Sequence, residues 1–274
     1  LGYPSTNAVL LRHHTNAVYA VRDVVVKIAP PRLGMDRIRA VVDLVRWLAA
    51  HGFPPVELSP HLPQPMAIDG YPVTVWQRLD ITRPVTLAEL GYLLRRLHSL
   101  PTPPISLPGL SPVENICRSV NESHILTDED RQLLADRLDA LGKAWENKFS
   151  LGACLVQSDP QVGNALRQDD GTPVLSDWDG AAIGPREWDI ATVAVHCRRF
   201  KTSEPNAFAA FTAAYGWDAK AWDGFDKLCR LRELQMIATN ARKSPPGTPA
   251  AAEVHSRIAG LRSSADDSKP WRIL

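Results

Sequence analysis

The chain has 274 residues, 45% hydrophobic and 22% charged, a composition typical of a globular protein with material for one large core or two modest ones. Its formal net charge of +1 argues against a broad basic surface that follows nucleic acid phosphates. The four cysteines form no CxxC pair and no apolar run is long enough to cross a bilayer, so we expect a cytoplasmic protein with reduced thiols and no membrane partner.

The first 79 residues are expected to form a small sheet with one helix. Three runs rich in β-branched residues lie at 9–11, 17–21 and 24–28, and short polar turns separate them. Turns this short join antiparallel neighbours, so the three runs predict a meander.

The third run contains one charged residue, Lys27, between apolar ones. A buried ammonium group is costly unless an anion meets it, and a nucleotide phosphate is such an anion. The alternative is that Lys27 lies on an edge strand and faces water. We favour the buried position because of the acidic residues that occur later in the chain.

A helix is expected over residues 35–51, ending at Gly52. Its apolar residues recur at helical spacing and would form one buried stripe: Ile38, Val41, Val45 and Leu48. An alternating pattern over residues 71–79 then predicts a strand.

From Asp80 onward the pattern is helical. Thr86 and Glu89 have the spacing of a capping box, and so have Thr127 and Asp130 at the start of a second helix. Later helices are expected to begin at Asp189 and to occupy residues 205–215, 222–241 and 249–261.

The candidate site residues cluster between residues 156 and 189. Asp159 and Asn164 precede one short predicted strand, and Asp177 follows the next. The polar turn 168–171 lies between the two strands. The Asp-Gly pair in this turn is a strong hairpin signal. A closed hairpin makes Asn164 and Asp177 spatial neighbours, so three oxygen-bearing side chains can converge on magnesium and a phosphate.

Phosphoryl transfer requires the groups that this stretch supplies. A carboxylate must orient the accepting hydroxyl, and an amide oxygen and a second carboxylate must hold magnesium on the nucleotide phosphates. In the kinase template an Asp is followed five residues later by a metal-binding Asn, and by a metal-binding Asp past a short hairpin. Asp159, Asn164 and Asp177 have this order and spacing.

This stretch resembles the aminoglycoside phosphotransferase family, the small-molecule branch of the protein-kinase-like fold. The family pattern is His-Gly-Asp, four residues, Asn, and later Ile-Asp-Trp/Phe-Asp/Glu; here it reads as residues 157–159, Asn164 and residues 176–179. The resemblance implies an α+β bilobal protein-kinase-like fold, with a small antiparallel-sheet lobe over residues 1–79 and a larger helical lobe over residues 80–274.

The resemblance also implies an ATP- and Mg²⁺-dependent phosphotransferase that acts on a hydroxyl of a small molecule. Asp159 would be the catalytic carboxylate, and Asn164 and Asp177 would hold Mg²⁺. These roles are expectations carried over from the family motif.

Further residues would bind the nucleotide by the same resemblance. Lys27 would steady the phosphates, and the turn formed by Thr15 and Asn16 would cover them, although it contains no glycine. Backbone groups from Gln77 to Leu79 would contact adenine.

The sequence departs from the family at three positions. Val41 stands where a glutamate normally pairs with the strand lysine, so Lys27 would depend on phosphate or on a carboxylate such as Asp177. Gln157 replaces the histidine and can brace the loop through hydrogen bonds. Ser158 replaces a glycine and would be strained if that position needs a positive φ.

Two other functional classes remain open. One is a nucleotide- or ligand-binding pseudo-kinase without phosphotransfer, because of the departures at Val41 and at residues 157–158. The other is a carboxylate-bridged metal hydrolase built on Asp159, Asp177 and Asp179, which we disfavour because no histidine accompanies the acids.

The acceptor is not defined by the sequence. An aminoglycoside-like antibiotic, a sugar, an amino alcohol and a nucleoside all remain possible, as do ATP and GTP as donors and any oligomeric state. Acidic residues around the second helix could line a pocket for a polycation, although a solvated helix face is favoured.

Overall fold

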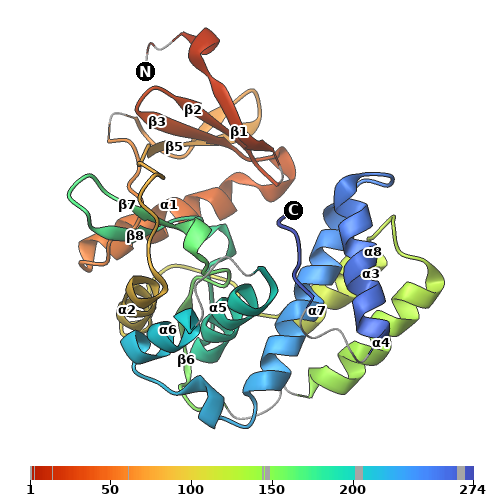
Figure 1. Cartoon of the computed structure of the whole chain (residues 1–274). Helices are drawn as coiled ribbons and strands as arrows, with labels where there is room; N and C mark the ends of the chain where they lie inside the picture. The colour runs from red at the N-terminus through yellow and green to blue at the C-terminus, as the bar shows by residue number, and fades with distance from the viewer. Residues whose placement is uncertain are drawn as a thin grey trace.

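The structure is a computed structural model that describes residues 2, 4–13, 15–60, 62–143, 145, 149–200, 206–263 and 269–274. Its architecture is α+β, with an N-terminal antiparallel sheet followed by a helical C-terminal region (Figure 1). This confirms the expected fold class. Among the described residues, no helix combines the length and the hydropathy that crossing a membrane requires.

The sheet has five strands in the order β1-β2-β3-β5-β4. The strands are β1 Val9–His13, β2 Ala17–Val21, β3 Val24–Ile28, β4 Met66–Ile68 and β5 Tyr71–Gln77. The meander of the first three strands is confirmed, and β5 ends two residues before the expected boundary. Because β3 pairs with β2 on one side and β5 on the other, the edge-strand alternative for Lys27 is wrong.

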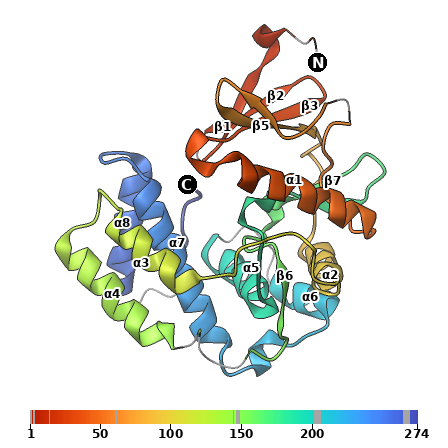
Figure 2. The same ribbon diagram turned by 180° about the vertical axis from the view of Figure 1, so that it is seen from behind.

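Helix α1, Met35–Ala50, lies beneath the sheet, and the C-terminal region lies on its other side (Figures 1 and 2). Its apolar stripe is buried as the periodicity predicts, and it ends one residue earlier than expected, before Gly52 at φ 70°. Val41, Leu44 and Leu48 of this helix share one apolar core with Leu90 and Trp178 of the C-terminal region.

The helical region has two parts, and both views separate them (Figures 1 and 2). One part contains α2 Leu87–His98, α5 Arg186–Phe200 and α6 Ala207–Tyr215. The other contains α3 Pro112–Asn121, α4 Asp128–Gly142, α7 Phe225–Lys243 and α8 Pro249–Arg262, which enclose a second apolar core. Both predicted capping boxes, at the starts of α2 and α4, are present.

Three predicted helix starts differ from the structure. α5 begins at Arg186 rather than Asp189, because the chain passes from a strand directly into the helix. α7 begins at Phe225 rather than residue 222, since Ala219–Ala221 form a separate 3-10 turn capped by Asp218. α6 begins at Ala207, and position 205, its expected start, lies outside the described residues.

Four short strands lie within the helical region. β6 Ala153–Val156 pairs with β9 Ala182–Pro185, and β7 Ala165–Arg167 pairs with β8 Pro173–Leu175 as the predicted hairpin. The Asp-Gly signal is therefore confirmed. The two pairs bring residues 157–164 and 176–181 together at one end.

A bidentate ion pair connects this hairpin to α2. Arg167 donates to both carboxylate oxygens of Glu89 at 2.9 and 2.8 Å, and Glu89 also accepts from the backbone of Thr86 in the capping box. The hydrogen bonds from Arg167, followed by those from Thr86, lower the pKa of Glu89 to about 2 against the opposing effect of burial.

We predict that Glu89→Gln lowers the free energy of unfolding by about 1 kcal/mol at pH 7, given that the pair is partly exposed. A carboxylate with a depressed pKa contributes stability above its unfolded value near 4.5, and that contribution is lost as the pH falls toward 2. Urea unfolding should show that the free energies of unfolding of the native protein and of Glu89→Gln differ less at pH 3 than at pH 7. A difference independent of pH would contradict this; Asp36→Asn, at a 97% exposed carboxylate, is the control.

Candidate active site

A buried carboxylate fixes the loop that carries Asp159. Asp189, in the first turn of α5, is fully buried and accepts the backbone N–H groups of Gln157 and Ser158 at 2.9 and 2.8 Å. His98 contacts the same carboxylate at 3.1 Å and the hydroxyl of Tyr215 at 2.8 Å, so both of its ring nitrogens have partners in the core. The loop is therefore held by the start of a helix.

Gln157 connects this loop to the end of the hairpin. Its side-chain N–H groups donate to the carbonyls of Ser176 and Asp177 at 3.0 and 3.1 Å, and its amide oxygen accepts from the backbone N–H of Asp159 at 2.8 Å. The prediction that a glutamine can brace the loop is confirmed. The backbones of Asp159 and Asp177 thus have fixed relative positions.

Ser158 adopts φ 71°, in the left-handed region that favours glycine, so the expected backbone strain is present. Its hydroxyl donates to the carbonyl of Gly180 at 2.6 Å, which offsets part of that cost. A Cβ at Gly180 would lie 2.5 Å from the Ser158 hydroxyl oxygen, so a larger residue there would require this hydroxyl to turn away.

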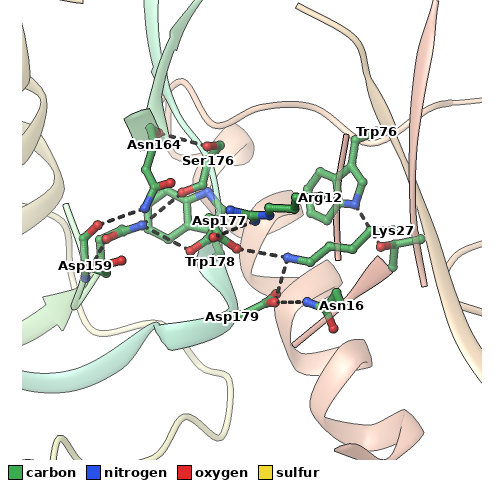
Figure 3. A network of polar contacts seen from close by, with 12 residues as sticks. Arg12, Asn16, Lys27, Trp76, Asp159, Asn164, Ser176, Asp177, Trp178 and Asp179 are labelled. Carbon is green, nitrogen blue, oxygen red and sulfur yellow. Dashed lines mark hydrogen bonds and ion pairs between the residues drawn. The ribbon is translucent and has the colours of Figure 1, made fainter. Parts of the chain in front are cut away.

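Asp159 and Asn164 lie side by side (Figure 3). The side-chain amide of Asn164 donates to the backbone carbonyl of Asp159 at 3.0 Å, and the backbone N–H of Ser176 donates to the carbonyl of Asn164 at 2.8 Å. Holding the Asn164 nitrogen in this way also fixes its amide oxygen, the atom that could ligate a metal.

Two further carboxylates, those of Asp177 and Asp179, lie against the sheet (Figure 3). The ammonium group of Lys27 contacts Asp177 at 3.0 Å and Asp179 at 2.7 Å, and the guanidinium of Arg12 contacts Asp177 at 3.0 Å. Burial opposes ionisation of Lys27, but the two carboxylates outweigh it and raise its pKa. Burial likewise opposes ionisation of Asp177, and Lys27 and Arg12 outweigh it and lower its pKa.

These residues fit a magnesium ion. Asp177, Asp179 and the amide of Asn164 are hard oxygen donors, and two of them already converge on one cation. Within the described ranges, no group of three or more His, Cys, Asp or Glu side chains could hold a metal alone. Mg²⁺ usually combines one or two carboxylates with phosphates and waters, which agrees with this set.

Val41, which the resemblance places at the position of a glutamate, lies near Lys27. Both residues line a cavity of about 10 Å³, which has room for about one water molecule. Lys27 takes its counter-charge from Asp177 and Asp179, as the sequence suggested for Asp177.

The remaining predicted nucleotide contacts differ in their surroundings. Asn16 is buried, donates to Asp179 at 2.7 Å, and has a side-chain oxygen with no hydrogen-bond partner among the described residues. Thr15 and Leu79 are partly exposed. The backbone N–H of Gln77 already donates to Glu57 at 2.9 Å.

Sequence reasoning missed two residues at Asp159. Arg232 of α7 donates to the carboxylate of Asp159 at 2.5 Å, and Nε2 of His196 in α5 lies 3.8 Å from the same oxygen. The premise that no histidine accompanies the acids is therefore wrong for Asp159. No local sequence signal marks either residue, because both lie on helices far along the chain.

Solved structures with a similar fold cover nearly all of the chain. An amicoumacin kinase solved with AMP-PNP, Ca²⁺ and Ami superimposes with TM-score 0.77 at 16% identity, covering 98% of this chain and 92% of that one. A microcompartment-associated aminopropanol kinase gives TM-score 0.71 at 17% identity, covering 94% and 92%. A spectinomycin phosphotransferase solved with ADP and spectinomycin gives 0.66 at 14%, covering 95% and 91%. The fold is therefore protein-kinase-like.

The family model of the phosphotransferase enzyme family, APH, matches residues 8–228. The chain belongs to this family of small-molecule kinases, as the resemblance implied. No curated protein sequence matches it significantly.

The strain at Ser158 generates a prediction about stability. Ser158→Ala removes the hydrogen bond to Gly180 but keeps the positive φ, so it should lower the free energy of unfolding by about 1 kcal/mol. Ser158→Gly loses the same bond but relieves the strain, so it should be more stable than the alanine variant by about 1 kcal/mol. Urea unfolding measures both.

Ser99 is the matched control, because its hydroxyl also donates to a carbonyl, that of Arg96, but its φ is −93°. Alanine should be the more stable replacement there. If the alanine variant were more stable than the glycine variant at Ser158 as well as at Ser99, the strain at Ser158 would be contradicted.

Proposed function

We propose that this protein transfers the γ-phosphoryl group of ATP to a hydroxyl of a small molecule in a Mg²⁺-dependent reaction. The observation that carries the proposal is the hydrogen-bonded bracing by Gln157, which joins the backbone of Asp159 to that of Asp177. Phosphoryl transfer depends on positioning and charge neutralisation, so a fixed geometry between acceptor-side and metal-side groups is what it needs.

Asp159 is proposed to orient the acceptor. Its side chain is 47% exposed, and the contact with Arg232 uses one carboxylate oxygen, so the other can accept a hydrogen bond from a hydroxyl. It would take the hydroxyl proton as the new bond to phosphorus forms.

Asn164 and Asp177 are proposed to hold Mg²⁺, with Asp179 beside them. The bound ion would supply neutralisation of the charge on the nucleotide phosphates. Lys27 would exchange its contacts with Asp177 and Asp179 for phosphate oxygens, and Thr15 and Asn16 would lie above the phosphates. The buried, unpartnered side-chain oxygen of Asn16 supports a polar ligand or water there.

Adenine is proposed to bind at the end of β5. The N–H groups of Gln77 and Arg78 donate to Glu57 and Asp23, so the hydrogen bonds to adenine would come from carbonyls of this segment and from the backbone of Leu79. The proposed lobe boundary near residue 79 lies at the same place.

Variants of the two aspartates test the proposal. Asp159→Ala should lower turnover at least about 1000-fold with nucleotide affinity nearly unchanged, because it removes the group that orients the hydroxyl. Asp177→Ala should abolish Mg²⁺-dependent nucleotide binding. Calorimetry with a non-hydrolysable ATP analogue and a coupled ADP assay over hydroxyl-bearing metabolites and antibiotics measure both.

Asp170→Ala, in the exposed hairpin turn, is the matched control and should change neither quantity. Normal turnover of either active-site variant would contradict the assignment. Magnesium-dependent ATP binding without ADP formation across the acceptor panel would favour a pseudo-kinase, for which Val41 beside Lys27 is the supporting observation.

A further inference from the structure

Two basic side chains lie at one carboxylate oxygen of Asp159. Arg232 projects from α7 and His196 from α5, two helices that pack against each other. Lys243, at the C-terminal end of α7, is within electrostatic range of both Asp159 and Asp177. A polycationic acceptor placed next to Asp159 would be repelled by the charges of Arg232 and Lys243.

Arg232 is held as a buried cation with unused donors. It is 8% exposed, lies over the ring of Trp188 at 5.6 Å, and donates to Asp159 and Gln235. A guanidinium has five N–H groups, and its buried Nε has no hydrogen-bond partner among the described residues. A buried charge paired with one partly exposed carboxylate is incompletely compensated.

His196 repeats this pattern on the neighbouring helix. Its ring stacks on Phe200 at 4.9 Å, which fixes its orientation, and its Nε2 is buried without a hydrogen-bond partner in the described part of the chain. Two buried nitrogen groups with unused hydrogen-bonding capacity therefore flank one oxygen of Asp159.

Two of the acidic residues around α4 are paired with arginines. Asp130 is buried against Arg262 at 2.5 Å, and Glu122 contacts Arg242 at 3.2 Å. Asp128 and Asp136 are exposed on α4. Exposed carboxylates of this kind are typical of a solvated helix face.

We infer that the acceptor is a hydroxy acid, whose anionic group binds at Arg232 and His196 while its hydroxyl binds the free oxygen of Asp159. The inference rests on the proposed phosphotransfer for the role of the hydroxyl. The two sites adjoin, because Arg232 and His196 both lie at the Oδ1 atom of Asp159, so the anion and the hydroxyl must be close in the acceptor. Arginine suits a carboxylate because its planar donors match two oxygens.

The test uses three sets of hydroxyl compounds, and within each set the terminal group is a carboxylate, a neutral amide or an amine. They are glycolate, glycolamide and ethanolamine; glycerate, glyceramide and 3-aminopropane-1,2-diol; and gluconate, gluconamide and glucamine. Binding is measured by calorimetry on the full chain with Mg²⁺ and a non-hydrolysable ATP analogue. In at least one set the carboxylate should bind at least about tenfold more tightly than the amide and the amine.

Arg232→Met should abolish this preference while leaving the affinity for the amide within about threefold, a separation that a merely structural role would not produce. Arg232→Lys should retain part of the preference. Arg230→Met, two residues away on α7 and contacting Asp226, is the charge-matched control and should keep it. If Arg232→Met does not fold, His196→Gln should reduce the preference.

The outcomes separate this inference from the proposed function. Carboxylate binding that depends on Arg232, without ADP formation from ATP, would support the anion site and contradict phosphotransfer. ADP formation with amines or amides and not with carboxylates would support phosphotransfer and overturn the anion site. Binding of no compound in the sets, or a preference unchanged in Arg232→Met, would also overturn it.

Discussion

The contact of one buried ammonium group with two carboxylates joins the two halves of this structure. Lys27 lies in the middle of a sheet, where an isolated charge is too costly to keep, and its counter-ions come from a loop about 150 residues later. The sheet therefore has to dock where Asp177 and Asp179 lie. Packing of α1 against the same core supports this docking with apolar contact.

The geometry of the site depends on a few buried polar groups that have their hydrogen bonds satisfied. Asp189 holds two consecutive backbone N–H groups, and Gln157 joins that loop to the hairpin. These bonds maintain Ser158 in a conformation that serine disfavours. Strain held at one residue by surrounding bonds is common at functional sites, and here it lies directly before the proposed catalytic carboxylate.

The site also has two faces of opposite sign. On the sheet side, Asp177 and Asp179 present negative charge that attracts cations, which suits a metal ion. On the helix side, Arg232 and His196 present positive or donor groups to Asp159. The first face is the one proposed to hold the metal ion, and the second is the one on which the proposed acceptor site rests.

The sequence alone determined the elements whose signals are local. The Asp-Gly turn predicted the hairpin, the Thr86 and Thr127 boxes predicted two helix starts, and a charge within an apolar run marked Lys27, because turn, cap and burial preferences act over a few residues. The spacing of Asp159, Asn164 and Asp177 indicated the family for the same reason. Only the tertiary structure decided that β3 is internal, that Asp179 shares Lys27 with Asp177, and that Arg232 and His196 flank Asp159. These contacts join residues far apart in sequence, and helix packing sets them without leaving a local pattern.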